Sequence, residues 1–199
     1  MTRVQAVLLR LAADLEAIRC EWALLGALAL AVRVAPRETT DVDVGVAVGD
    51  DREADHVVFE LHSRGYRDLQ EGVLVDKTTG HLSTMRLVAP GDEANGTNVD
   101  LLFDSSGIER EIVAAADRIE IVEGLIVPVV KTGHLLALKV FAGRPKDLGD
   151  VQAILEATDP TEIDRARHAL DLISRRGRDR GRDLAGELEV LLQQPRDFH

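Results

Sequence analysis

The sequence contains a single cysteine, Cys20, and aromatic residues make up only 3% of its 199 positions. One cysteine excludes a fold held together by disulfides. So few aromatic side chains argue against a protein that binds single strands by stacking bases on rings. Positive charge is also scarce, because 24 Lys and Arg residues stand against 35 Asp and Glu, a formal charge of −11. This acidity argues against sequence-independent nucleic-acid binding, which needs many cationic contacts with phosphates.

A long apolar run is missing as well. Residues 26–34 are apolar, but this stretch is far too short to cross a bilayer, and Arg33 interrupts it. Near the N-terminus, charged residues are interleaved with Leu and Ala, where a signal peptide would need an apolar core. With 45% apolar and 30% charged residues, the composition is that of a soluble globular protein. We therefore expect a cytoplasmic protein with no membrane partner.

The charge is distributed unevenly along the chain. Residues 1–164 carry 16 basic and 29 acidic side chains, a formal charge of −13, whereas residues 165–199 carry +2. Within 165–182, seven arginines stand against two aspartates, a local excess of +5. Two readings are open: a solvated helix–loop–helix, or a small basic patch that binds an anionic partner such as RNA.

Apolar periodicity predicts an α+β fold, with a mixed α/β front half and a helical back half. The predicted helices cover 4–19, 26–36, 51–64, 108–117, 132–142, 146–157, 161–175 and 181–193. The predicted strands cover 22–25, 41–48, 66–69, 81–88, 98–103, 119–122 and 125–129. We expect an α/β core over 1–130 and a helical region over 131–199.

The segment 41–48, with the sequence DVDVGVAV, is the first candidate for chemistry. Alternate side chains of a strand point to opposite faces, so four valines share one face while Asp41 and Asp43 share the other. Their Cα atoms then lie about 6.5–7 Å apart. Two neighbouring carboxylates on an apolar strand repel each other, and a divalent ion such as Mg²⁺ or Mn²⁺ relieves that repulsion. The alternative is a strand edge that faces water.

A third carboxylate, Asp100, lies in the apolar strand 98–103. If the two strands are neighbours, Asp100 completes a triad able to hold metal; otherwise it is an edge-strand acid or a turn former. Gly26 joins a strand to a helix whose first N–H groups can bind phosphate. Arg37, Thr39 and Thr40 lead into the Asp strand, where they bind nucleotide phosphates or shape the loop.

The order Gly26, Asp41-Val-Asp43-Val, then Val-Asp100-Leu resembles the motifs of the DNA polymerase β nucleotidyltransferase superfamily, hG[GS], Dh[DE]h and h[DE]h, where h is apolar. Ala27 departs from the pattern by standing where Ser or Gly is usual, so a hydroxyl contact is lost while the backbone N–H remains. The resemblance implies the nucleotidyltransferase fold, a small mixed sheet flanked by helices and followed by a helical bundle.

The helical half of the sequence resembles one particular family of this superfamily. Residues 135–139 (LLALK) and 144–150 (RPKDLGD) are similar to the LLALK…R-x-KD-x-x-D stretch of AbiEii-type toxins, a family that includes the MenT toxins. Taken alone, Lys139 is either a snorkelling lysine or a cation placed to neutralise a triphosphate. Asp147 and Asp150 either favour the macrodipole of a helix start or orient Lys139 or the acceptor.

The resemblance implies a metal-dependent toxin that transfers a nucleoside monophosphate from an NTP to the 3′ end of tRNA and so blocks translation. In this scheme Asp41 and Asp43 hold Mg²⁺ or Mn²⁺, and Asp100 is a third ligand or the base. The implied catalytic set also contains Lys139 and Asp150. The implied nucleotide contacts are Gly26, Ala27, Arg37, Thr39, Thr40, Lys139 and Asp147.

The resemblance also implies a cognate antitoxin as partner. Phosphorylation of Thr39 or Thr40 would place negative charge beside Asp41 and repel both a triphosphate and RNA. Two other readings stay open. In the first, the enzyme uses a different acceptor, either a small molecule such as an aminoglycoside or a protein hydroxyl. In the second, the pocket has lost its catalytic activity and the domain only binds a partner.

Overall fold

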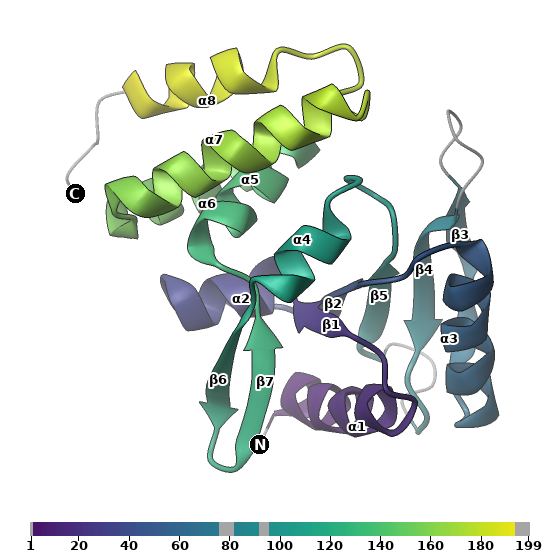
Figure 1. Cartoon of the computed structure of the whole chain (residues 1–199). Helices are drawn as coiled ribbons and strands as arrows, with labels where there is room; N and C mark the ends of the chain where they lie inside the picture. The colour runs from purple at the N-terminus through teal and green to yellow at the C-terminus, as the bar shows by residue number, and fades with distance from the viewer. Residues whose placement is uncertain (1, 76–81, 92–95, 194–199) are drawn as a thin grey trace.

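The structure, a computed structural model, describes residues 2–75, 82–91 and 96–193. Within these ranges seven strands form one mixed sheet in the order β3-β4-β5-β2-β1-β7-β6 (Figure 1). This order makes β2 and β5, which carry the predicted carboxylates, direct neighbours. The strand bounds are β1 (Trp22–Leu24), β2 (Asp41–Val46), β3 (Arg67–Val75), β4 (Leu82–Val88), β5 (Asn98–Leu102), β6 (Asp117–Val122) and β7 (Leu125–Val129).

The alternating pattern of β2 explains its central place in the sheet. Val42, Val44 and Val46 are completely buried on one face, as the sequence predicts. On its two edges β2 pairs antiparallel with β1 and parallel with β5. The register places Asp43 beside Asp100, so the chain brings together two carboxylates that are 57 positions apart in sequence.

Eight helices accompany the sheet in the described ranges, and none of them is long and apolar enough to cross a membrane. Four precede the last hairpin: α1 (Arg3–Ala17), α2 (Gly26–Arg33), α3 (Asp51–Ser63) and α4 (Glu109–Ala114). The other four follow it: α5 (Thr132–Ala142), α6 (Asp147–Ala157), α7 (Pro160–Arg175) and α8 (Leu184–Gln193). Most of these elements agree with the predicted ones to within about three residues at each end, but β3 continues to Val75, six residues beyond the predicted strand 66–69. The predicted α+β class is confirmed.

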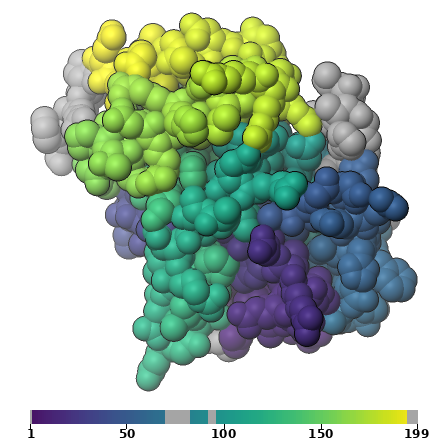
Figure 2. All heavy atoms as spheres, in the orientation of Figure 1, coloured from purple at the N-terminus to yellow at the C-terminus, as the bar shows by residue number. Residues whose placement is uncertain are grey.

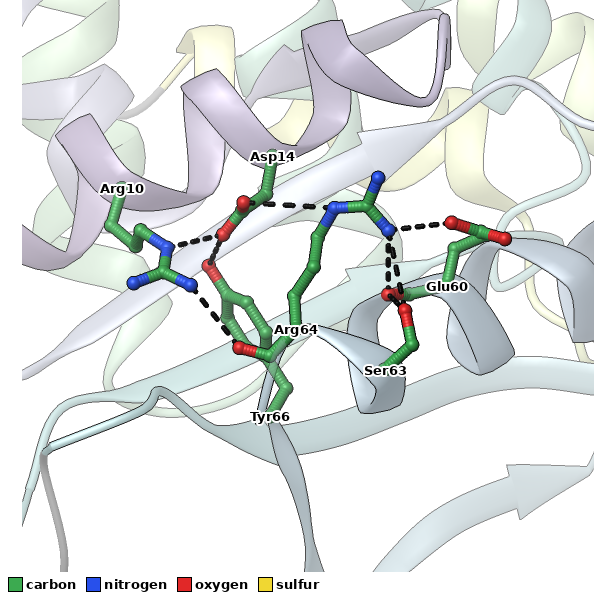
Figure 3. A network of polar contacts seen from close by, with 6 residues as sticks. All are labelled: Arg10, Asp14, Glu60, Ser63, Arg64 and Tyr66. Atoms are coloured by element: carbon green, nitrogen blue, oxygen red, sulfur yellow. Dashed lines mark hydrogen bonds and ion pairs between the residues drawn. The ribbon is translucent and has the colours of Figure 1, made fainter.

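Polar contacts join α1 to the connection between α3 and β3 (Figure 3). The carboxylate of Asp14 accepts hydrogen bonds from Arg10 Nε at 2.6 Å and from Tyr66 Oη at 3.1 Å. Arg64 lies 3.7 Å from the same carboxylate and binds the Glu60 side chain at 2.5 Å. Burial, followed by the charge and hydrogen bond of Asp14, raises the pKa of Tyr66. The network anchors the first helix to the edge half of the sheet.

The C-terminal helices form a layer beside the sheet, in which α7 and α8 lie outermost in green and yellow (Figures 1 and 2). The helix α5 is the most buried of the four, and α6, α7 and α8 all contact it. Gly133 permits a close approach of α7, because a Cβ at that position would lie only 2.9 Å from the Cβ of Arg165. Its backbone N–H also donates to Glu162 at 2.6 Å.

The arginines of 165–182 find partners within the molecule, many of them outside the segment. Arg176 binds Glu111 and the carbonyl of Gly107, and Arg178 binds Asp104. The guanidinium of Arg180 lies 4.5 Å from the Phe141 ring centroid. Ion pairs also form for Arg165 with Glu162, Arg167 with Asp164 and Glu189, Arg175 with Asp171, and Arg182 with Glu187. The structure therefore favours the helix–loop–helix interpretation of this segment, with its arginines bound to acids of the same chain, over a free basic patch.

Candidate active site

Two carboxylates and a helix N-terminus meet at the beginning of β2. Asp41 and Asp43 lie on the face of β2 opposite the buried valines. Gly26 begins α2 with φ +61°, and a Cβ there would lie 2.6 Å from Cγ and 2.8 Å from Cβ of Asp43. The Asp43 carboxylate thus lies against the Gly26 backbone, in a place that only glycine leaves open.

The surroundings of Asp43 differ from those of the other two predicted carboxylates. Within the described part of the chain its carboxylate has no hydrogen-bond or ion-pair partner. Burial, and then repulsion from Asp100 and Asp41, raises the pKa of Asp43 to about 6, although Lys139 and Arg144 act in the opposite direction. A half-buried carboxylate of this kind is stabilised by a cation from outside the chain.

Asp41 is held in place by its neighbours. Asn98 Nδ2 donates to Asp41 Oδ1 at 3.1 Å, and the Thr40 hydroxyl lies 3.5 Å from the same oxygen. The Thr39 hydroxyl accepts the backbone N–H of Asp41 at 3.2 Å. Of the two roles predicted for the threonines, the structure therefore shows loop shaping directly.

The third predicted carboxylate is already bound by an arginine. Arg86 on β4 lies directly across from Asp100 on β5. Its Nε lies 2.6 Å from Asp100 Oδ1 and its Nη2 lies 2.5 Å from Oδ2, so both carboxylate oxygens are engaged. This ion pair is a feature that the sequence did not predict.

The donor set fits a divalent cation in part. Among the described residues, no group of three or more His, Cys, Asp or Glu side chains is placed to hold a metal ion. The three predicted carboxylates therefore do not form such a group in this structure, in which Arg86 binds Asp100. Asp41 and Asp43 by themselves still offer hard oxygen donors, and Mg²⁺ is commonly bound by one or two carboxylates together with substrate phosphates.

A buried ionic cluster links α5 to α6. Lys139 Nζ lies 3.1 Å from Asp147 Oδ1 and 2.8 Å from Asp150 Oδ2, and all three residues are buried. Burial, only partly offset by Asp147, lowers the pKa of Lys139. Burial would raise the pKa of Asp147, but hydrogen bonds from Arg144 and Lys139 outweigh it and hold that pKa below its usual value. Asp147 and Asp150 thus orient Lys139, one of the two roles that the sequence left open.

Two further arginines belong to this cluster. Arg37, from the loop before β2, pairs with Asp150, and Arg144 binds Asp147 through two nitrogens at 2.6 and 3.0 Å. The hydrogen bonds to Asp147, and more weakly the charge of Asp43, raise the pKa of Arg144. The cluster therefore presents positive charge toward the unpaired Asp43.

An uncapped helix start and a cavity lie at two different parts of the site: the first adjoins Asp43, and the second adjoins the Lys139 cluster and is not lined by Asp41 or Asp43. Leu25, which precedes α2, gives its first turn no side-chain cap, so the N–H groups at Gly26 and Ala27 are available to a phosphate. A cavity of about 530 Å³ lies between α5, α6 and α8, within the size range of small-molecule sites. Lys139, Arg144 and Asp147 line one side of it, together with apolar residues of α6 and α8.

Three neighbours of the predicted residues were missed as members of the site: Arg86, Asn98 and Arg144. Arg86 lies in a predicted strand, but only the register between β4 and β5 shows that it faces Asp100. Arg144 belongs to the quoted motif, yet its contacts depend on how the link between α5 and α6 turns.

The sequence matches, over residues 8–198, the family described as the nucleotidyl transferase AbiEii toxin of type IV toxin–antitoxin systems. The chain belongs to this family. It is therefore a nucleotidyltransferase toxin, which implies an NTP substrate and an antitoxin as partner. No curated protein matches it.

Solved structures confirm the fold of this AbiEii-family chain. An antigenic nucleotidyltransferase-like protein from Paracoccidioides brasiliensis matches with a TM-score of 0.53 and 20% identity, over 94% of this chain and 92% of the other. The lincomycin-bound lincosamide adenylyltransferase LnuA matches with a TM-score of 0.50 and 16% identity, over 77% and 97%. ANT(2″)-Ia, in complex with adenylyl-2″-tobramycin, matches with a TM-score of 0.50 and 11% identity, over 87% and 99%.

Proposed function

We propose that this toxin transfers a nucleoside monophosphate from an NTP to the hydroxyl at the 3′ end of tRNA, with release of pyrophosphate. The observation that supports it best is the opposition of charges around Asp43. This half-buried carboxylate, which has no ion pair with any described residue, lies against the N-terminus of α2, and Lys139 and Arg144 are near enough to lower its pKa.

In this proposal Asp41 and Asp43 hold Mg²⁺ or Mn²⁺. The ion would supply a Lewis acid that polarises the reacting phosphate. The chain's own groups bind the rest of the nucleotide: the N–H groups at Gly26 and Ala27 contact phosphate oxygens, and Arg144 with Lys139 neutralises the charge on the leaving pyrophosphate. Asp147 and Asp150 keep Lys139 in place, and Arg37 acts through Asp150.

Asp100 is proposed as the group that accepts the proton of the attacking hydroxyl. It lies beside Asp43 in the register of β2 and β5, and it is 7% exposed. A general base must come within hydrogen-bond reach of the proton that it removes. Arg86 binds both oxygens of Asp100, so Asp100 can accept the proton only after at least one of these hydrogen bonds opens.

Both parts of the chain contribute to the proposed site. We assign the three aspartates and Gly26 to an α/β core over 1–130. We assign Lys139, Asp147 and Asp150 to a helical region over 131–199, which completes the proposed site. The antitoxin, or a phosphate on Thr39 or Thr40, would block it at the loop where both hydroxyls contact Asp41.

A small cationic acceptor is the second candidate, and one observation favours it over RNA. The arginines of 165–182 are paired within the chain, so this segment offers little free positive charge to a phosphate backbone. The net charge of −11 instead favours a positively charged acceptor such as an aminoglycoside.

Transfer of label separates these acceptors. The purified chain is incubated with Mg²⁺ and each α-labelled NTP, together with total tRNA, an aminoglycoside or cell protein. We expect label in the 3′ end of tRNA, lost in Asp41→Asn and retained in the control Asp55→Asn, a change on the exposed side of α3. Label on the aminoglycoside or on protein, with none on tRNA, would reject the tRNA proposal.

A further inference from the structure

We propose that Arg86 competes with the divalent cation for Asp100 and thereby sets the metal affinity of the site. The inference rests on the proposed function, since it takes Asp41 and Asp43 as the metal ligands. It concerns a residue of the neighbouring strand β4, which is not part of the motifs on which the family resemblance depends.

The geometry of the pair leaves no oxygen of Asp100 free. Nε and Nη2 of Arg86 approach the two oxygens separately, at 2.6 and 2.5 Å. A bidentate pair of this kind is among the stronger hydrogen-bonded contacts in proteins. A cation held by Asp41 and Asp43 therefore gains Asp100 as a ligand only if at least one of these bonds opens.

The exposure of the two side chains to solvent shows which of them can move away from the contact. Asp100 lies in the middle of the sheet, between β2 and β4, and its side chain is 10% exposed. The Arg86 side chain is 45% exposed, so its guanidinium can leave for solvent at low cost. The pKa of Arg86 is raised first by the hydrogen bonds to Asp100, and the charges of Asp41 and Asp43 also raise it. The arginine thus compensates the same negative charge that a metal ion would.

The Arg86–Asp100 ion pair offsets negative charge when no metal ion is bound. Asp43 and Asp100 are paired in register on adjacent strands, and Asp43 has no hydrogen-bond or ion-pair partner among the residues that the structure describes. Without Arg86, the half-buried Asp43 and the buried Asp100 would repel each other, and only the more distant charges of Lys139 and Arg144 would offset Asp43. In the metal-free protein Arg86 offsets this repulsion. The same contact lowers the affinity for a metal ion, because the ion competes with Arg86 for Asp100.

Binding of Mn²⁺ to the full chain, without nucleotide and followed by electron paramagnetic resonance, tests this. We expect Arg86→Gln to bind Mn²⁺ at least about tenfold more tightly than the wild type, because the ion no longer has to displace a charged hydrogen bond. Arg86→Gln combined with Asp100→Asn should return to the wild-type affinity, because the released ligand is gone.

The matched control is Arg67→Gln. Arg67 is an exposed residue of β3, and removing it subtracts the same unit of charge without touching a carboxylate of the site. Screening by salt should keep its effect below about twofold. Arg86→Lys keeps the positive charge but loses the two-pronged guanidinium contact, so its Mn²⁺ affinity should lie between those of the wild type and Arg86→Gln. This variant replaces Arg86→Gln in the test if Arg86→Gln does not fold.

Two results would overturn the inference, and they differ in what else they overturn. Wild-type binding that is lost in Asp43→Asn but unchanged in both Arg86 variants rejects the competition alone. Absence of Mn²⁺ binding in every variant rejects it together with the metal site of the proposed function.

Discussion

A methyl group at Gly26 provides the sharpest test of the site geometry. Gly26 has φ +61°, a conformation that costs an L-residue about 1 kcal/mol. In Gly26→Ala the new Cβ would also lie 2.6 Å from Asp43 Cγ, whereas carbon atoms rest about 3.5–4.0 Å apart. Relief of this overlap requires the Asp43 carboxylate or the α2 backbone to move by about 1 Å.

The expected magnitudes follow from these two terms. Backbone strain and overpacking together should lower the free energy of unfolding by about 2–4 kcal/mol. A displacement of about 1 Å at a reacting group costs about a hundredfold in rate, so kcat/KM for nucleotidyl transfer should fall at least that far. Urea unfolding measures the first quantity, and label transfer from the NTP to the acceptor measures the second.

Gly124→Ala is the matched control for this substitution. Gly124 has φ +80° in the β6–β7 turn, and a Cβ there meets no heavy atom within 4 Å. The control therefore carries the strain without the collision, and it should lose about 1 kcal/mol with unchanged activity. If Gly26→Ala matches the control in both stability and activity, the close approach of Asp43 to Gly26 is refuted.

Three further predictions concern buried polar groups. Tyr66→Phe removes a hydrogen bond to Asp14 and should lower the free energy of unfolding by about 1–2 kcal/mol in urea titrations; no loss would show that water replaces the hydroxyl. Asp43→Asn should abolish transfer in the presence of Mg²⁺. Because it removes a half-buried charge next to Asp100, in metal-free buffer at pH 7.5 it should raise the unfolding free energy by about 1–3 kcal/mol, and a destabilised variant would contradict this. Burial lowers the pKa of His134 to about 4 from 6.5, so the unfolded chain binds more protons between these values; stability is full above pH 6.5 and should fall by up to about 3 kcal/mol toward pH 4. A stability–pH slope that is identical in His134→Gln would refute that assignment.

The sequence by itself determined the elements and the identity of most proposed site residues. Four alternating valines predict the strand that holds Asp41 and Asp43. Three of them, Val42, Val44 and Val46, form the buried face of β2, while Val48 lies beyond the end of the strand and is half-buried. The helices and strands follow from apolar periodicity because burial of one face is a local property of each segment. The family follows from motifs that are short and contiguous, such as LLALK and RPKDLGD.

Only the tertiary structure decided which side chains meet. Strand register is a matter of pairing between distant segments, so no local pattern shows that Asp100 faces both Asp43 and Arg86. Counting charges within 165–182 likewise leaves out acids from other parts of the chain, such as Glu111 and Asp104, which the fold places beside these arginines. Local spacing specifies which face a residue occupies, whereas the partner of a charge depends on elements that are far apart in the chain.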